Sequence, residues 1–204
     1  KIEEKERLIQ LGIAHYSETV SKESPPTDKY LQLFLELTST YKSRLAQEVV
    51  KLSKIIEDKV DGDICIVSLA RAGTPIGALV NRAINKFSRF SSCHYSISIV
   101  RDKGIDFNAL DHLINDLGID PKSIVFIDGW TAKGVITREL KKSVSEYNLS
   151  RRAEISDALF VISDIGSTAD FSATKDDYTI PSALMNSTVS GLVRRSILNK
   201  KIES

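Results

Sequence analysis

One short segment gathers an acid, a hydroxyl, a cation and a glycine directly after an apolar stretch. Residues 124–127 are apolar, and they are followed by Asp128, Gly129, Trp130, Thr131, Ala132, Lys133 and Gly134. Backbone N–H groups in such a turn and at the start of the next helix are unpaired, so they favour an anion. Asp128 can accept hydrogen bonds from ligand hydroxyls, and Lys133 adds a cation for a phosphate. The segment therefore predicts a sugar-phosphate site.

A second group of phosphate-binding candidates follows an earlier apolar stretch, residues 63–69. It consists of Arg71, Ala72, Gly73 and Thr74. Small residues let the backbone approach a phosphate closely, and an arginine supplies a fork of donors. The alternative is an ordinary turn between a strand and a helix, with an exposed arginine. Because both groups occur in this order on successive crossovers, phosphate binding is the favoured interpretation.

Together the two groups resemble the ribose-phosphate and pyrophosphate loops of type I phosphoribosyltransferases. The resemblance implies that Asp128 holds the ribose, that residues 129–134 hold the 5′-phosphate and that residues 71–74 hold pyrophosphate. It also implies Mg²⁺ bound through the ligand phosphates, without a direct cage of protein side chains. Gly129 stands where these enzymes have a second acid, and Ala132 where some purine-specific members have one. These departures leave open a binding module that has lost turnover.

The elements around these groups alternate between helix and strand. Apolar periodicity predicts one or two helices over 30–60, then strand 63–69, helix 75–87, strand 94–100, helix 107–117, strand 124–127, helix 135–147 and strand 159–163. This order predicts an α/β fold in which helices flank a parallel sheet, with ligands at the carboxyl ends of the strands. We expect a helical segment, 1–60, packed on a phosphoribosyltransferase-like domain, 61–204, in a single compact unit.

Further candidates follow two of the expected strands. Arg101 and Lys103 come after strand 94–100, where they would form either a mobile lid over the site or a charged turn. A hood that reads the acceptor is expected from about residue 164 onward. Its candidate residues are Asp164, Asp177, Tyr178, Asn186 and Ser187. The alternative for Asn186 and Ser187 is a capped helix, in which their polar side chains form hydrogen bonds with the backbone.

Composition narrows the function classes. The 204 residues carry a net charge of +1 with both signs interspersed, which argues against nucleic acid as a partner. No apolar run is long enough to span a bilayer, and two cysteines suit a reducing compartment. We therefore expect a cytoplasmic protein with a small-molecule ribose phosphate as its partner. The sequence leaves the oligomeric state open, a homodimer included.

Four longer strings resemble one bacterial family: SLARAGTPIG, HYSISIVRDKGID, IVFIDGWTAKG and DDYTIPSALMNSTVSGLVRR. This is the StiP family, found with tellurium-resistance gene clusters and labelled both as a cysteine protease and as a phosphoribosyltransferase-like domain. The resemblance runs from about Glu3 to the end of the chain. It implies ribosyl transfer or cleavage, by a pentosyltransferase acting on phosphoribosyl pyrophosphate, in a tellurium-resistance or stress pathway.

The protease label requires a cysteine within reach of a histidine. Cys65 is expected to be buried in a strand, where a thiol behaves as a small apolar group. Cys93 and His94 are neighbours on a strand and so point to opposite faces. His15 and His112 remain as partners for Cys93. The residues favour phosphoribosyl chemistry over peptide hydrolysis.

Overall fold

The computed structural model describes residues 7, 11 and 26–178. Its centre is a six-stranded sheet in the order β3-β2-β1-β4-β5-β6. The strands are β1 (Ile64–Ala70), β2 (Ser92–Val100), β3 (Gly104–Ile105), β4 (Ile124–Trp130), β5 (Leu159–Ser163) and β6 (Phe171–Thr174). All neighbours pair in parallel except β3, which is antiparallel to β2. The predicted α/β fold with a parallel sheet is confirmed.

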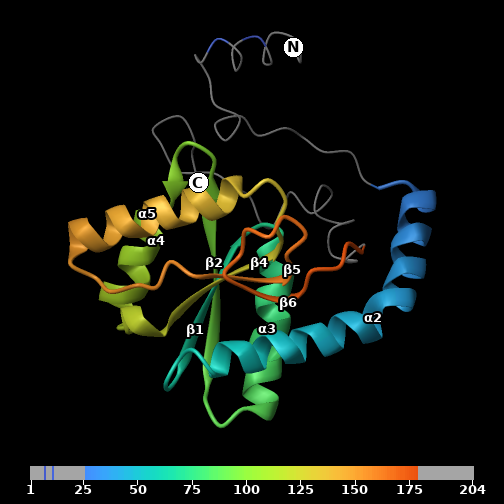
Figure 1. Ribbon diagram of the computed structural model, residues 1–204, viewed down its shortest axis with the longest axis horizontal. Helices are drawn as coiled ribbons and strands as arrows, with labels where there is room; N and C mark the ends of the chain where they lie inside the picture. Colours follow the sequence, from blue (N-terminus) through green and yellow to red (C-terminus); the bar gives the residue numbers. More distant parts are fainter. Residues whose placement is uncertain (1–6, 8–10, 12–25, 179–204) are drawn as a thin grey trace.

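Helices cover both faces of this sheet (Figure 1). They are α2 (Asp28–Glu57), α3 (Gly73–Phe87), α4 (Phe107–Asp111) and α5 (Val135–Arg151). α4 continues as a π-helical turn, His112–Asp116, and a 3-10 turn, Pro121–Ser123, leads into β4. α2 and α3 lie on one side of the sheet, and α4 and α5 on the other.

The central strand β1 shows why the sheet needs two helical layers. Every residue of β1 is buried, as is typical of a strand covered on both faces. Ile64 and Ile66 pack in the core beneath α2 and α3, while Val67 and Leu69 pack in the core beneath α5. Side chains alternate between the faces of a strand, so one apolar run supplies both cores. Each fully buried aliphatic side chain contributes about 1.5–3 kcal/mol relative to exposure.

α2 is one helix that changes direction midway (Figure 1). Thr27 caps its start by accepting a hydrogen bond from the N–H of Tyr30, 3.3 Å away. Near the middle, the Thr40 hydroxyl donates to the carbonyl of Glu36, a bond that often bends helices. The half after the bend packs on the sheet through Val49, Leu52 and Ile56. The boundary expected at residue 60 stays a prediction, since most of residues 1–25 lie outside the described part.

The order of the strands changes direction at β1. The chain steps from β1 outward to β2, and then β4 returns to the other side of β1. Connections leave the carboxyl ends of β1 and β4 in opposite directions at such a point, and a crevice opens between them. Both predicted phosphate-binding groups follow these two strands.

Several predicted boundaries were wrong. β4 extends to Trp130, beyond the expected end at 127, because its pairing with β5 continues through Asp128 and Trp130. The neighbouring strand thus overrides the local turn signal of Gly129. β3 and β6 were not predicted, since two and four residues give too little alternation to detect. The segment 107–117 is a short α-helix followed by a π-helical turn, not one regular helix.

Candidate functional site

A cavity of about 400 Å³ opens at the carboxyl ends of the central strands. Its walls come from β1, β2, β4, the turns that follow them and the first turn of α5. The polar and loop residues that line it are Arg71, Ala72, Arg101, Asp128, Trp130, Thr131, Ala132, Lys133, Gly134 and Thr137. Apolar side chains complete it: Leu69, Ala70, Ile99, Val135, Ile136 and Leu159. The cavity therefore lies at the switch point between β1 and β4.

The charges of the lining favour an anionic ligand. Arg71, Arg101 and Lys133 bring cations from three separate segments, and Asp128 brings an acid from β4. The N–H of Gly129 donates to Asp128 Oδ1 over 2.8 Å, which helps to orient the carboxylate. The structure thus brings together residues that lie up to 62 positions apart, from Arg71 to Lys133. Their roles in binding stay predictions.

The loop between β4 and α5, residues 131–134, is held from behind. The N–H of Thr131 donates to the carbonyl of Ser163 at 3.0 Å. The Thr131 hydroxyl donates to Asp164 Oδ1 and accepts from the N–H of Gly166 at 3.2 Å. Thr131 is only 5% exposed, so its hydroxyl serves protein contacts more than ligand contacts. The 5′-phosphate contact expected of Thr131 stays a prediction.

Two glycines set the path of this loop. Gly134 precedes α5 with φ of 69°, in the left-handed region that glycine adopts without strain. A Cβ on Gly166 would lie 1.7 Å from the carbonyl oxygen of Ala132, so the segment after β5 touches the loop backbone directly. The loop thereby turns sharply into α5, whose first residues line the cavity. The unpaired N–H groups of a helix N-terminus attract anions.

Asp164 is buried behind the loop, outside the cavity lining. Burial raises the pKa of this carboxyl group, but hydrogen bonds from the Thr131 hydroxyl and the N–H groups of Thr168 and Ala169 outweigh it. The net pKa lies below the usual value. Asp164 therefore stays ionised as a structural acceptor. Its predicted contact with an acceptor substrate is not supported by this placement.

The turn after β1 approaches β4 closely. The peptide bond between Ala70 and Arg71 is cis. A Cβ on Gly73 would lie 2.5 Å from the carbonyl oxygen of Ile127, so only glycine lets the start of α3 pack at this distance. The Thr74 hydroxyl pairs with that of Ser96 at 2.6 Å, away from the cavity lining. Of residues 71–74, Arg71 and Ala72 face the cavity.

Residues 101–103 form the charged turn of a hairpin between β2 and β3. The N–H of Lys103 donates to the carbonyl of Val100 at 3.0 Å, and Asp102 has φ of 65°. The N–H of Asp102 donates to Glu139 Oε2 at 3.2 Å, which ties the turn to α5. Arg101 lines the cavity, whereas Lys103 lies outside the lining.

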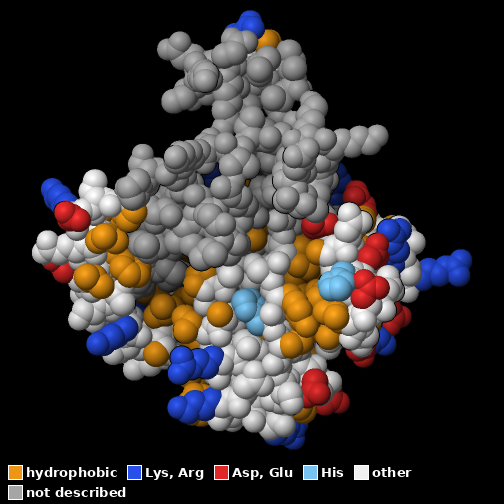
Figure 2. All heavy atoms as spheres, turned by 180° about the vertical axis from the view of Figure 1, so that it is seen from behind, with side chains coloured by type: hydrophobic (Ala, Val, Ile, Leu, Met, Phe, Trp, Pro, Cys, Tyr) orange, Lys and Arg blue, Asp and Glu red, His pale blue; other side chains and the backbone are white. Residues whose placement is uncertain are grey.

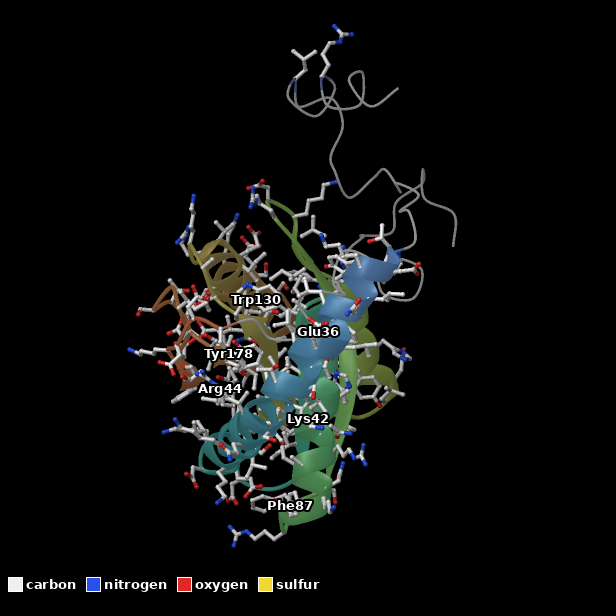
Figure 3. The ribbon with its side chains drawn as sticks, turned by 90° about the vertical axis from the view of Figure 1, so that its right-hand side faces the viewer. Glu36, Lys42, Arg44, Phe87, Trp130 and Tyr178 are labelled. Atoms are coloured by element: carbon white, nitrogen blue, oxygen red, sulfur yellow. The ribbon has the colours of Figure 1, made fainter. Side chains whose placement is uncertain are left out.

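Tyr178, another hood candidate, packs on α2, outside the cavity lining. The Tyr178 hydroxyl donates to Glu48, and the Arg44 guanidinium lies 4.0 Å from the Tyr178 ring centroid (Figure 3). Burial and the Glu48 carboxylate raise the pKa of Tyr178 above its usual value. Asp177 is exposed and outside the lining. Asn186 and Ser187 lie outside the described residues.

Comparison with known proteins identifies the family. A family model described as "Tellurite-like stress resistance cysteine protease StiP" matches residues 1–204. The chain belongs to the StiP family. A relative named "Cysteine protease StiP" from Acinetobacter baylyi is 45% identical over 194 residues, which is 95% of this chain and 49% of the relative. The chain thus spans about half the length of that relative.

Solved structures of hypoxanthine phosphoribosyltransferases are also similar to this StiP chain. One from Trypanosoma cruzi is 13% identical and covers 65% of this chain and 77% of its own, with a TM-score of 0.47. A point mutant of the enzyme from the same organism, complexed with the product IMP, is 14% identical over 66% and 69%, with a TM-score of 0.46. One from Staphylococcus aureus is 15% identical over 67% and 76%, with a TM-score of 0.43.

The two cysteines of this StiP chain lie at the opposite end of the sheet from the cavity. Cys65 and Cys93 are register partners near the starts of β1 and β2, and both pack in the core beneath α5. Burial, and then the neighbouring Cys93, raise the pKa of the Cys65 thiol. A thiol in such a place is a poor nucleophile.

The histidines do not complete a catalytic pair with these thiols in the described part of the chain. His94 faces α3, where its Nε2 lies 2.8 Å from Ser68 Oγ, and burial lowers its pKa. His112 Nδ1 lies 2.7 Å from Asp116 Oδ2 on the π-helical turn. The expectation that Cys93 and His94 point to opposite faces agrees with these contacts. His15 lies outside the described residues.

Residues 7, 11 and 26–178 hold no group of three or more His, Cys, Asp or Glu side chains arranged to bind a metal ion. They also hold no helix with the length and apolar character needed to cross a membrane. On the face shown in Figure 2, basic and acidic side chains both occur around the edge.

Proposed function

We propose that the cavity between β1 and β4 binds phosphoribosyl pyrophosphate or a related ribose phosphate, and that the protein transfers or cleaves the ribosyl group. One observation carries the proposal. Two arginines, a lysine, an acid and a helix N-terminus all line one cavity at the switch point of a parallel sheet. The family description suggests that this chemistry serves resistance to tellurite-like stress.

The 5′-phosphate would lie against residues 131–134 and the first turn of α5. Lys133 and the backbone N–H groups there supply positive charge and donors. The loop is already fixed by contacts with residues 163–168, so little ordering entropy is lost on binding. This end of the cavity would anchor the ligand.

The ribose would lie over Asp128, whose carboxylate can accept from its hydroxyl groups. Gly129 is outside the cavity lining and supplies no second acid. A Cβ there would lie 3.5 Å from the Ala72 carbonyl oxygen and 3.9 Å from Ile76 Cγ1. Asp128 is therefore the one acid among the described residues that line the cavity.

The pyrophosphate would lie beside Arg71 and Arg101. In the transfer step the bond from ribose C1′ to pyrophosphate oxygen breaks, pyrophosphate leaves with the electron pair, and an acceptor atom or water forms the new bond to C1′. Arginine side chains stabilise the negative charge that develops on the leaving group. Mg²⁺ held by the ligand phosphates would neutralise part of the same charge. Asp128 is the lining residue suited to contact such an ion.

Calorimetric titration of phosphoribosyl pyrophosphate, with and without Mg²⁺, tests the site. We expect Mg²⁺-dependent micromolar binding that is lost in Asp128→Asn and kept in Asp177→Asn. Asp177 is the control because it is an exposed acid outside the lining. Equal binding by wild type and Asp128→Asn would contradict the assignment. Since Trp130 lines the cavity and is the chain's single tryptophan, its fluorescence gives a second readout.

A second candidate is a ribose-phosphate-binding module without turnover. Gly129 and Ala132, which stand where acids occur in the enzymes that this chain resembles, favour it. Pyrophosphate release on mixing the protein with phosphoribosyl pyrophosphate and nucleobases separates the two. Release that is absent while binding is intact would favour the module.

The relative's name suggests a third candidate, a thiol peptidase. Cys93 is the more exposed of the two thiols. The test of this candidate is therefore the peptidase activity of the Cys93→Ala variant. Loss of a measured peptidase activity in this variant would support the third candidate. Full activity would exclude Cys93 as the nucleophile.

A further inference from the structure

We propose that Asp164 and Thr131 form a positioning pair that holds residues 131–134 in the shape needed to bind a phosphate. Neither side chain needs to touch the ligand. The inference rests on the proposed function for its consequence in binding, while its structural part can be tested without any ligand.

The pair is built around one buried oxygen. Asp164 is 4% exposed, and its Oδ1 accepts three hydrogen bonds. The donors are the Thr131 hydroxyl, the N–H of Thr168 at 2.9 Å and the N–H of Ala169 at 3.1 Å. A buried carboxylate must be compensated in this way, because desolvation of a charge is costly. The contacts of Asp164 thus join the phosphate loop to the segment after β5.

Thr131 completes the connection in the other direction. Its hydroxyl accepts from the N–H of Gly166 at 3.2 Å while it donates to Asp164. Its N–H donates to the carbonyl of Ser163. One threonine therefore makes three contacts with residues 163–166, which is more than a solvent-facing loop residue needs.

The segment behind the loop is itself fixed to the edge of the sheet. The N–H of Asp164 donates to the carbonyl of Thr174 at 2.9 Å, and the Ser163 hydroxyl donates to the carbonyl of Asp176 at 2.7 Å. β6 thereby holds the Asp164 backbone in place. The position of the phosphate loop is set by β5 and β6 through this pair, and not by the loop's own sequence alone.

The steric fit supports the same conclusion. Gly166 lies so close to the Ala132 carbonyl that a Cβ on it has no room. A Cβ on Gly134 would lie 2.8 Å from Thr168 Cγ2. A contact between two backbones and a contact between the Gly134 backbone and the Thr168 side chain thus lie beside the hydrogen-bonded pair. The loop between them has one compact arrangement against residues 164–168.

Three variants test the pair. Thr131→Val keeps the shape and removes the hydroxyl, Thr131→Ser keeps the hydroxyl, and Asp164→Asn removes the charge. We measure acrylamide quenching of Trp130 without ligand, and the Kd for phosphoribosyl pyrophosphate by calorimetry. Trp130 directly precedes the loop, so its accessibility reports loop position.

We expect Thr131→Val and Asp164→Asn to raise Trp130 quenching and to weaken binding about tenfold or more, which is about 1.4 kcal/mol. Thr131→Ser should restore wild-type values in both measurements. The double variant should be no worse than its stronger single variant, because Thr131→Val removes the hydrogen bond that loss of the Asp164 charge weakens. Additive losses, or failure of serine to rescue, would overturn the pair.

A control separates positioning from general instability. Ser143→Ala removes a buried hydroxyl on α5 that accepts from the N–H of Ile105, away from the loop. It should lower stability and leave Trp130 quenching and Kd unchanged. If wild type binds no ribose phosphate, the proposed function fails, yet the quenching comparison still decides the pair. Unchanged quenching in Thr131→Val overturns the pair whatever the ligand does.

Discussion

The two ends of β1 are chemically opposite. Near its amino end, Cys65 is 1% exposed and packed among aliphatic side chains. At its carboxyl end, the strand delivers Arg71 into a cavity shared with Asp128 and Lys133. Ala70 lies five positions after Cys65, which is roughly 16 Å at about 3.3 Å per residue. The thiols therefore cannot act on a ligand held in the cavity.

The two ends of β1 differ because the carboxyl ends of the strands border a crevice, whereas the amino ends lie in the core. Connections at the switch point diverge and leave a crevice, and loop residues there keep their charges in contact with water. At the amino end the same strands enter the core at once. Burial raises the pKa of the Cys65 thiol and so disfavours the thiolate that nucleophilic chemistry requires. Within the described residues, the charged side chains that could bind an anionic ligand therefore gather at the carboxyl ends of the strands.

The largest effect should come from Gly166→Ala. The new Cβ would lie 1.7 Å from the Ala132 carbonyl oxygen, and this neighbour is backbone that cannot rotate away. Overpacking of this kind costs about 3 kcal/mol of unfolding free energy. Urea denaturation measures it. If this substitution were harmless, the carboxyl end would not be the tightly fixed region described here.

Gly129→Ala is the matched control for that substitution. Its Cβ would lie 3.5 Å from the nearest neighbour, an ordinary contact distance. We expect a much smaller loss of stability. Equal losses at the two glycines would point to backbone entropy, and not to the contact between the loops.

Cys65→Ser should come next, with a loss of about 2 kcal/mol in unfolding free energy. The hydroxyl would be buried among apolar side chains, where an uncompensated polar group costs about 1–3 kcal/mol. Thermal or urea unfolding measures the loss, and calorimetry should show unchanged ribose-phosphate binding. Weaker binding in a stable Cys65→Ser variant would show that the two ends of β1 are energetically coupled.

The same contrast explains what could be predicted from the sequence. Core strands such as residues 64–70 and 159–163 give continuous apolar runs, so their type and place were predicted nearly to the residue. Arg71 and Asp128 each follow such a run, and this position predicts a place at the carboxyl end of a strand. The sheet order then brings them to one cavity. The sequence predicted a parallel sheet with ligands at the carboxyl ends of its strands, but not the order of those strands.

Other features depend on contacts distant in sequence. Thr131 and Asp164 are 33 positions apart, and nothing local distinguishes their hydrogen bond from two ligand-facing side chains. Tyr178 packs on α2, where its hydroxyl donates to Glu48 and the Arg44 guanidinium lies over its ring. Both partners are over 100 residues earlier in the sequence. The signal that could have suggested the Thr131–Asp164 contact is the pair of glycines, Gly134 and Gly166, because glycine often marks a place where another part of the chain packs closely.

Arg71→Ala should weaken pyrophosphate binding about tenfold, or about 1.4 kcal/mol. Charge-assisted hydrogen bonds contribute about 1.5–3 kcal/mol, and the cavity partly exposes this side chain to water. Calorimetry with Mg²⁺-pyrophosphate measures the change. Arg82→Ala is the control, since Arg82 is an exposed arginine on α3 outside the lining. Similar losses in both variants would mean that overall charge, and not the cavity, attracts the anion.

The smallest effect concerns acid stability, because burial and hydrogen bonding act in opposite directions on Asp164. Burial raises the pKa of Asp164, and the hydrogen bonds from Thr131, Thr168 and Ala169 lower it by a larger amount. The pKa in the folded protein therefore lies below the unfolded value of about 3.9. The carboxylate therefore stabilises the fold above about pH 3.9. That contribution is lost as pH falls through the folded pKa. Unfolding free energies between about pH 6 and pH 3 should decline less steeply in Asp164→Asn than in wild type.

Asp111 provides the comparison that connects this effect to the cavity. A hydrogen bond from Arg151 holds the pKa of Asp111 below its usual value, against the opposing effect of burial, and Asp111 lies outside the cavity lining. Asp111→Asn should flatten the acid decline in the same direction while ribose-phosphate binding stays at the wild-type value. Asp164→Asn should change both. If the two variants behaved alike in binding, Asp164 would be a structural carboxylate like Asp111. It would then not position residues 131–134 for ligand binding.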